Sequence, residues 1–140
     1  MGTAVCGTAE IEVSTDAGHV WEAMKDFGNL EWAQGTAEYS VVGDGIGMVR
    51  SVRLEDSEEW LDERLLAVDE SARRFEYAID AGMAGVDNYR AAGQAIPVDG
   101  GCLIRWQCSG SVEPTSAAEM QSLVEALAEG IAGLFAARFQ

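Results

Sequence analysis

The sequence contains few of the side chains from which metal centres and nucleophilic active sites are built. His19 is the only histidine, and no carboxylate group stands beside it at the spacing of metal ligands. The cysteines are Cys6, Cys102 and Cys108, an odd number without the spacing of a zinc site. We therefore expect free thiols in a reducing compartment, no bound metal or other cofactor, and no nucleophile–base pair.

Positive charge is also scarce. Nine Lys and Arg stand against 24 Asp and Glu, so the formal net charge is −15. A surface of this sign repels phosphate backbones and anionic lipid, which makes nucleic acid and membrane surfaces poor partners. No run approaches the roughly 20 apolar residues of a membrane span, and the first residues lack the basic and apolar regions of a signal peptide. We expect a cytoplasmic protein without membrane insertion.

The rest of the composition is typical of a folded globular chain. Hydrophobic residues make up 48% of the sequence and charged residues 24%. A length of 140 residues is enough for one core, and the chain has no internal repeat, low-complexity tract or linker. The sequence therefore predicts one domain over residues 1–140, as a monomer or a homodimer.

Periodicity predicts an α+β fold. Residues 4–13 alternate as a first strand, and Ser14-Thr15-Asp16 supplies N-caps for a helix that runs from Ala17 to Gly28-Asn29. A second short helix is expected at residues 30–32. From Thr36 the period is two, and short turns separate the segments, which indicates an antiparallel meander. The six expected strands are 37–42, 47–54, 60–69, 73–79, 86–97 and 101–112, with turns that include Asp80-Ala81-Gly82.

A long C-terminal helix follows Pro114. Ser116 and Glu119 fit a capping box, in which each side chain satisfies an amide of the first turn. The helix carries an apolar stripe at helical spacing, and we expect that stripe to face the concave side of the sheet. Its members are Met120, Val124, Leu127, Ile131 and Leu134, flanked by Leu123, Phe135 and Phe139.

This order of elements, together with several short motifs, resembles the SRPBCC or START-like superfamily, in its polyketide cyclase/dehydrase-like branch. The similarity covers nearly the whole chain. Each motif is weak alone, and their order and spacing make the assignment specific. They are Val20-Trp21, Asp26-Phe27, Trp32, Gly45-Ile46-Gly47-Met48-Val49-Arg50, Glu63-Arg64-Leu65, Asp69, Asn88-Tyr89-Arg90 and Trp106.

The resemblance implies a helix-grip fold, in which a curved seven-stranded antiparallel sheet wraps the long C-terminal helix and two short helices follow the first strand. It also implies an internal cavity between sheet and helix. It does not imply one reaction, because members of the superfamily carry lipids, sense hormones or cyclise polyketides, and fold is a poor guide to chemistry.

Glu63 is the most informative polar residue. It shares strand parity with Leu61, Leu65 and Ala67, an otherwise apolar face directed at the last helix. A carboxylate on such a face needs a partner or a raised pKa. Two interpretations stay open: Glu63 anchors polar ligand groups in the cavity, as the resemblance implies, or it pairs with a neighbouring arginine and has no further role.

Other cavity positions follow from the resemblance. Tyr89 and Gln107 match polar positions that face the cavity in relatives, Tyr77 matches an aromatic wall, and Trp32 lies at the mouth. Glu31 stands where hormone receptors carry a lysine for a ligand carboxylate, which argues against an acidic ligand held in that way. The expected ligand-binding set is Trp32, Arg50, Val52, Glu63, Tyr77, Tyr89, Gln107, Val124, Leu127 and Ile131.

Two functions of different class fit these residues best, and a third, a protein-interaction module with a vestigial cavity, stays open. The first is a carrier or sensor that binds a small hydrophobic metabolite, whether lipid-like, aromatic or polyketide. The second is a cofactor-independent cyclase, dehydratase or isomerase in which Glu63 acts as base and Tyr89 donates to an enolate oxygen. The acidic loop 55–59 is expected to be solvated, or to act as a gate over the cavity as the equivalent loop does in relatives.

Overall fold

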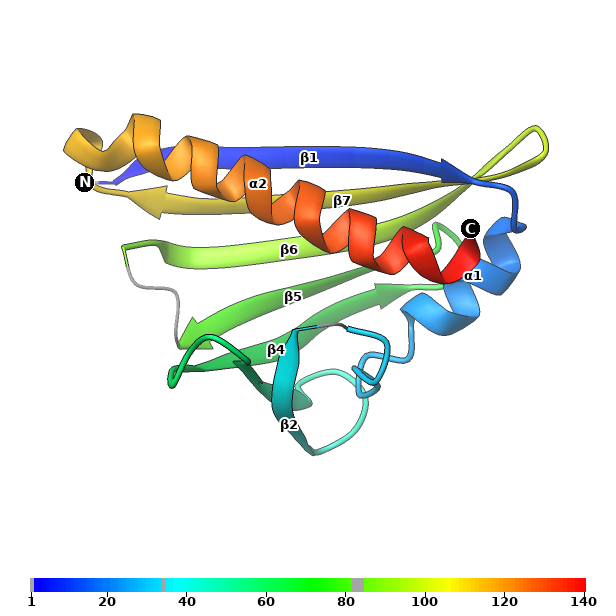
Figure 1. The fold of residues 1–140 in the computed structure, drawn as a ribbon, viewed down its shortest axis with the longest axis horizontal. Helices are drawn as coiled ribbons and strands as arrows, with labels where there is room; N and C mark the ends of the chain where they lie inside the picture. The colour runs from blue at the N-terminus through cyan, green and yellow to red at the C-terminus, as the bar shows by residue number, and fades with distance from the viewer. Residues whose placement is uncertain (1, 34, 82–84) are drawn as a thin grey trace.

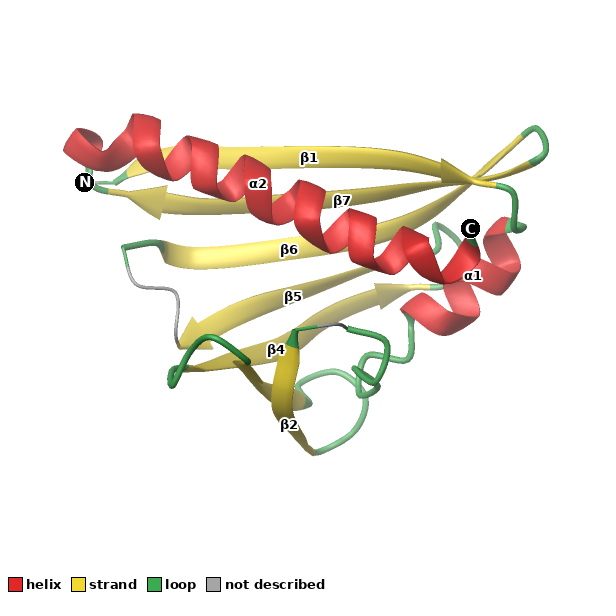
Figure 2. Ribbon diagram, viewed as in Figure 1, coloured by secondary structure: helices red, strands yellow, loops and turns green. Residues whose placement is uncertain are grey.

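A computed structural model describes residues 2–33, 35–81 and 85–140. Seven antiparallel strands form a single sheet in the order β1-β7-β6-β5-β4-β3-β2, and α2 runs obliquely across one face of it (Figures 1 and 2). The strands are β1 (Thr3–Val13), β2 (Thr36–Val42), β3 (Val49–Leu54), β4 (Trp60–Asp69), β5 (Arg74–Ala81), β6 (Asp87–Val98) and β7 (Gly101–Val112). The helices are α1 (Ala17–Met24) and α2 (Ala117–Ala136), with 3₁₀ turns η1 (Pro114–Ser116) and η2 (Ala137–Phe139).

The topology is the expected antiparallel meander, with the first strand added at the β7 edge of the sheet. Each strand from β2 to β7 pairs with its sequence neighbour, and β1 then pairs with β7 over its whole length, from Thr3 opposite Val112 to Val13 opposite Cys102. The helix-grip prediction is therefore confirmed. The turn expected at Asp80-Ala81-Gly82 lies partly outside the described residues.

The segment after β1 differs from the expectation in one respect. Asp16 caps α1, because its side chain accepts a hydrogen bond of 3.0 Å from the backbone N–H of His19. The helix ends at Met24, one turn before the predicted stop. Among residues 25–33, turns stand where a second short helix was expected, such as the one in which the Ala33 N–H bonds to the Leu30 carbonyl at 2.9 Å.

The start of α2 is also a correction. Ser116 occupies the N-cap, but its side chain makes no capping hydrogen bond, so the predicted capping box does not form. The physical reason is the 3₁₀ turn η1, which precedes α2 directly and bonds the Ser116 N–H to the Glu113 carbonyl at 2.9 Å. The chain enters α2 already coiled, without the extended N-cap geometry that a capping box needs.

The helix packs on the sheet through small residues. The buried side chains of α2 are Val124, Ala128, Ala132, Phe135 and Ala136, and the helix contacts β1 and β7. Gly7 of β1 lies directly beneath it: a Cβ on Gly7 would come 2.7 Å from the Cα of Glu125. Small side chains on both surfaces allow this close approach. The larger stripe, Leu127, Ile131 and Leu134, is consequently turned away from β1 and β7.

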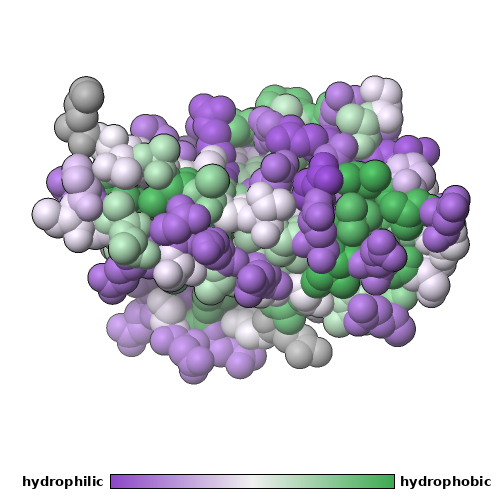
Figure 3. Space-filling model, turned by 90° about the horizontal axis from the view of Figure 1, so that it is seen from above, coloured by the Kyte–Doolittle hydropathy of each residue, from purple (hydrophilic) through white to green (hydrophobic). Residues whose placement is uncertain are grey.

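Length and composition alone would allow Pro114–Phe139 to span a membrane, although the core helix of a sheet protein passes the same test. Here the helix buries its alanine face against β1 and β7. Hydrophilic residues extend across the face of the molecule shown in Figure 3, with hydrophobic residues between them.

Candidate functional site

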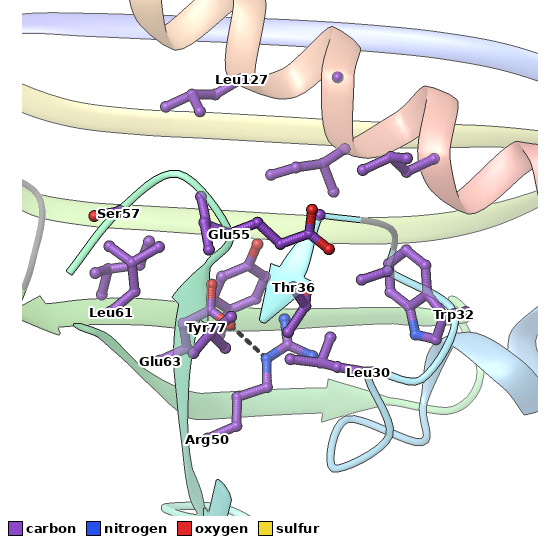
Figure 4. A pocket seen from close by; sticks show the side chains of 18 of the residues that line it. Leu30, Trp32, Thr36, Arg50, Glu55, Ser57, Leu61, Glu63, Tyr77 and Leu127 are labelled. Atoms are coloured by element: carbon purple, nitrogen blue, oxygen red, sulfur yellow. Dashed lines mark hydrogen bonds and ion pairs between the residues drawn. The ribbon is translucent and has the colours of Figure 1, made fainter. Parts of the chain in front are cut away.

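A pocket of about 620 Å³ lies between α2 and strands β3 to β7, on the side of the helix that carries the large apolar stripe. Figure 4 shows its interior. Most of the wall is apolar or aromatic, and charged groups occur in two places, in the floor and at the rim. The lining residues are Leu30, Trp32, Ala33, Gly35, Thr36, Arg50, Val52, Leu54, Glu55, Asp56, Ser57, Leu61, Glu63, Tyr77, Ile79, Tyr89, Trp106, Ala126, Leu127, Gly130, Ile131 and Leu134.

The floor contains a buried ion pair. Arg50 on β3 and Glu63 on β4 stand opposite each other in the sheet register, and the Arg50 Nε donates to Glu63 Oε1 at 2.5 Å. The Arg50 Nη1 donates to the Phe27 carbonyl at 2.9 Å, and its guanidinium lies 3.9 Å from the centre of the Phe27 ring. The two side chains are only 8% and 11% exposed. Glu63 therefore pairs with an arginine and also borders the pocket. Its role as an anchor for polar groups of a ligand stays a prediction.

Two phenols extend the polar part of the floor. Tyr77 on β5 and Tyr89 on β6 are almost completely buried. Burial raises the pKa of both far above the usual range, and the negative charge of Glu63 raises the pKa of Tyr77 further. Both hydroxyls stay protonated and can donate a hydrogen bond. The Cys108 thiol is a hydrogen-bond neighbour of the Tyr89 hydroxyl, and burial raises the pKa of this thiol too.

Trp106 adds an unsatisfied donor. Its side chain is 2% exposed, and its indole N–H has no hydrogen-bond acceptor among the described residues. The N–H comes near the Tyr77 hydroxyl without the geometry of a hydrogen bond. A buried donor left without an acceptor is destabilising, so an oxygen placed near it would be held favourably.

The rim is formed by the β3–β4 connection and the segment before β2. The Glu55 N–H donates to the Gly35 carbonyl at 2.8 Å, which ties the two segments together. Figure 4 shows the Glu55 side chain reaching over the floor toward α2. Trp32 lies at the other end of the pocket, its ring against Phe135 of α2 at a centroid distance of 5.2 Å.

Eight of the ten residues expected to bind ligand line this pocket: Trp32, Arg50, Val52, Glu63, Tyr77, Tyr89, Leu127 and Ile131. Gln107 and Val124 do not. Gln107 alternates with the buried Trp106 and Cys108, so its side chain points to solvent on the outer face of the sheet. Val124 is fully buried among the small residues that pack against the sheet.

Parity also fails at one position of β4. Ala67 was expected to face inward with Glu63 and Leu65, but it is exposed. The pairing of β4 with β5 shifts between Leu65 and Ala67, so one extra residue reverses the alternation beyond that point. Glu63 lies before the shift and keeps its inward direction.

Several lining residues were missed. Trp106 shares parity with the buried Ile104 and Cys108, which was a usable signal. Ala126 and Gly130 stand four apart beside the large apolar stripe, a spacing that places them on the same side of a helix. Leu54, Leu61 and Ile79 come together only through the pairing of β3, β4 and β5. The described residues contain no group of three or more His, Cys, Asp or Glu able to hold a metal ion.

Comparison with known proteins gives one family match and many similar structures. Residues 4–140 match the family described as polyketide cyclase / dehydrase and lipid transport. Norcoclaurine synthase from Thalictrum flavum, a point mutant in complex with a transition-state analogue, has 20% identity and a TM-score of 0.82, over 99% of this chain and 96% of that one. A structure of this synthase with dopamine and hydroxybenzaldehyde has 19% identity and a TM-score of 0.81, over 97% and 86%.

A protein from Thermobifida fusca has 27% identity and a TM-score of 0.79, over 96% of this chain and 92% of that one. No curated protein matches the chain. The likeness to norcoclaurine synthase shows that the seven-stranded sheet and its long helix are shared.

Proposed function

This chain belongs to the polyketide cyclase/dehydrase and lipid-transport family, and from that premise we propose that its pocket binds one small, largely apolar metabolite as a carrier or sensor. The ligand would be lipid-like, aromatic or of polyketide type. We likewise propose that residues 1–140 act as one domain, because the sheet and α2 together enclose the pocket. The observation that carries the proposal is an apolar pocket of about 620 Å³ that ends on a buried ion pair.

The size and lining of the pocket support this function. Pockets for small molecules are typically about 300–1,000 Å³, mostly apolar, with a few placed polar groups. Here the stripe of Leu127, Ile131 and Leu134 forms one wall, while Val52, Leu61 and Ile79 contribute from the strands. An apolar ligand that covers these side chains gains about 25 cal/mol for each Å² of apolar surface removed from water.

The floor would orient the ligand. Tyr77 and Tyr89 can donate through their hydroxyls, Glu63 can accept, and the unpartnered Trp106 N–H lacks an acceptor. A ligand with a carbonyl or hydroxyl oxygen at its inner end would satisfy these groups. Its apolar part would then extend toward α2.

The arrangement supports binding more directly than acid–base catalysis. As a base, Glu63 would need a free carboxylate oxygen directed at the ligand, and its Oε1 is already bonded to the Arg50 guanidinium at 2.5 Å. Tyr89 keeps its proton and suits the role of donor. A hydrogen bond donated by Tyr89 is useful in a passive binding site as well as in an enzyme.

The test is binding of the neutral dye Nile red to native protein, with a variant that fills the pocket. Leu127→Trp places an indole in the pocket wall, and we expect it to weaken dye binding at least about tenfold, or about 1.4 kcal/mol. Leu123→Trp is the matched control, since Leu123 stands one turn earlier on α2, is 42% exposed and does not line the pocket. We expect fluorescence titration to give a stoichiometry of one bound dye per chain.

Equal affinity in the two tryptophan variants would place the dye elsewhere on the molecule. Dye binding that begins only in partly denaturing conditions would mean that the native pocket takes no guest. Either result would end the proposal.

A further inference from the structure

The charges around the pocket are unbalanced. Its lining contains three carboxylates, Glu55, Asp56 and Glu63, against one guanidinium, that of Arg50. The sequence has nine Lys and Arg in all, and the structure describes every one of them.

The single cation in the lining is already occupied. Arg50 bonds to Glu63 at 2.5 Å and to the Phe27 carbonyl at 2.9 Å, and it lies over the Phe27 ring. An incoming carboxylate would have to displace Glu63 and leave that carboxylate buried without its partner, which is costly. The floor therefore has no free positive charge for an anionic ligand.

By contrast, the two carboxylates at the rim have no ion-pair partner among the described residues. Their residues, Glu55 and Asp56, are exposed. The neighbouring Arg53 is paired with Glu38 at 2.8 Å and donates to the Ser57 carbonyl. Arg138 lies over the Trp32 ring at 5.5 Å and is outside the lining.

The aromatic walls of the pocket, like the carboxylates of the rim, favour a positively charged ligand. Trp32, Tyr77, Tyr89 and Trp106 contribute aromatic rings to the lining. Two of these rings already attract cations of the protein itself: the Arg50 guanidinium lies 5.2 Å from the Tyr77 ring centre, and that of Arg138 lies 5.5 Å from the Trp32 ring centre. The net charge of −15 also raises the local concentration of cations and speeds their approach. The Trp106 N–H is buried and has no acceptor among the described residues, so the floor suits a neutral acceptor atom and offers no place to an ammonium group, which leaves the rim carboxylates for the positive charge.

We propose that the pocket selects organic cations, namely aromatic or alicyclic amines, over carboxylates of the same size. The ammonium group would lie at the rim beside Glu55 and Asp56, and the apolar body would fill the space between Tyr77 and Leu127. The inference rests on the proposed function, since it specifies the ligand class of the same pocket.

Three probes with one naphthyl body test it: 1-naphthylmethylamine, 1-naphthalenemethanol and 1-naphthoate, which are cationic, neutral and anionic at pH 7. Displacement of Nile red and calorimetry at low salt would give their affinities. We expect the amine to bind at least about tenfold more tightly than the carboxylate, with the alcohol between them. Because the Debye length falls from about 30 Å at 0.01 M salt to about 8 Å at 0.15 M, added salt should reduce the preference.

Two double variants locate the effect. Glu55→Gln with Asp56→Asn should lower the amine-to-carboxylate ratio at least about threefold and change the affinity for the alcohol less than the affinity for the amine. Glu58→Gln with Glu59→Gln removes the same charge from the same loop, at positions that do not line the pocket, and should leave the ratio close to that of the unmodified protein.

The outcomes separate the proposed selection for organic cations from the proposed binding function. If the alcohol binds and the amine shows no preference over the carboxylate, the charge selection is wrong while the binding function stands. Equal effects of the two double variants would also overturn it, because the preference would then come from the overall charge. If Nile red binds and none of the probes displaces it, the ligand class is wrong. If neither dye nor probes bind, the proposed function fails as well.

Discussion

Arg50 and Glu63 are the charged side chains that the structure buries among the described residues. Their opposite positions on β3 and β4 hold the pair in register, and Arg50 also bonds the Phe27 carbonyl. At the scale of single residues, this pair links the stability of the sheet to the floor of the pocket. A substitution that removes one partner leaves the other charge buried.

We expect Glu63→Gln to lower the free energy of unfolding by about 3 kcal/mol, because the Arg50 charge would remain without its counter-charge. The combined change Arg50→Met with Glu63→Leu should cost less than Glu63→Gln, since no buried charge remains. Urea denaturation of the three proteins measures the differences.

Asp80→Asn is the matched control. It breaks the pair of Arg64 and Asp80 beside the same strands, where both side chains are more than 40% exposed, and an exposed pair contributes about 1 kcal/mol or less. A loss in Glu63→Gln no larger than in Asp80→Asn would mean that the pair does not stabilise the fold.

At the scale of elements, α2 has two apolar faces with different tasks. The small face, with Ala128 and Ala132, lies on β1 and β7. The large face, with Leu127 and Ile131, covers the pocket. Because the small face packs on the sheet, the helix backbone lies close to Gly7. The larger side chains on the other face are then available to contact a ligand.

Gly7→Ala tests this contact. Its Cβ would lie 2.7 Å from the Glu125 Cα and 2.8 Å from the Val124 carbonyl oxygen, both backbone atoms that cannot turn aside. We expect a loss of about 1–3 kcal/mol in the free energy of unfolding, typical of an overpacked core.

Gly133→Ala is the companion change within α2. A Cβ there meets nothing within 4 Å, so the higher helix propensity of alanine should stabilise the protein by up to about 1 kcal/mol. Thermal denaturation compares the two variants. A neutral or stabilising Gly7→Ala would show that α2 can lift from β1 without cost.

At the scale of the whole molecule, the excess of acidic residues dominates the electrostatics. Most of the ion pairs in the structure are exposed, and each contributes little to stability. A net charge of −15 on 140 residues repels itself in the compact state. We infer that salt relieves more of this repulsion than it removes of the stabilisation by the exposed ion pairs.

We expect sodium chloride to stabilise the protein. Raising its concentration from 0.01 M to 0.15 M shortens the Debye length from about 30 Å to about 8 Å. The thermal midpoint should rise by about 2–4 °C, the shift that about 1 kcal/mol produces in a domain of this size. Calorimetry at constant pH measures it. A midpoint that falls with salt would mean that the surface ion pairs outweigh the repulsion.

The sequence by itself determined the α+β class and the antiparallel meander, because period-two alternation, short turns and a long apolar helix permit few arrangements. The helix-grip arrangement was implied by the resemblance to the family. The sequence also placed Glu63 on an inward face, since alternation along a strand is local, whereas the cavity positions of Tyr77 and Tyr89 were implied by the resemblance to the family. The cytoplasmic location and the oligomeric state stay predictions.

Only the tertiary structure decided which face of α2 packs on the sheet. At Gly7 the sheet comes close to the helix backbone at Val124 and Glu125. Such close packing leaves room on that face for Ala128 and Ala132 but not for leucine, although leucine is the more hydrophobic.

The remaining decisions of the tertiary structure concern single positions. The pairing shift in β4 turned Ala67 outward, and Gln107 faces solvent beside the buried Trp106. The partner of Glu63 was undetermined until β3 and β4 paired and brought Arg50 opposite it. Pairing, close approach and register join residues far apart in the chain, and local patterns contain no information on such contacts.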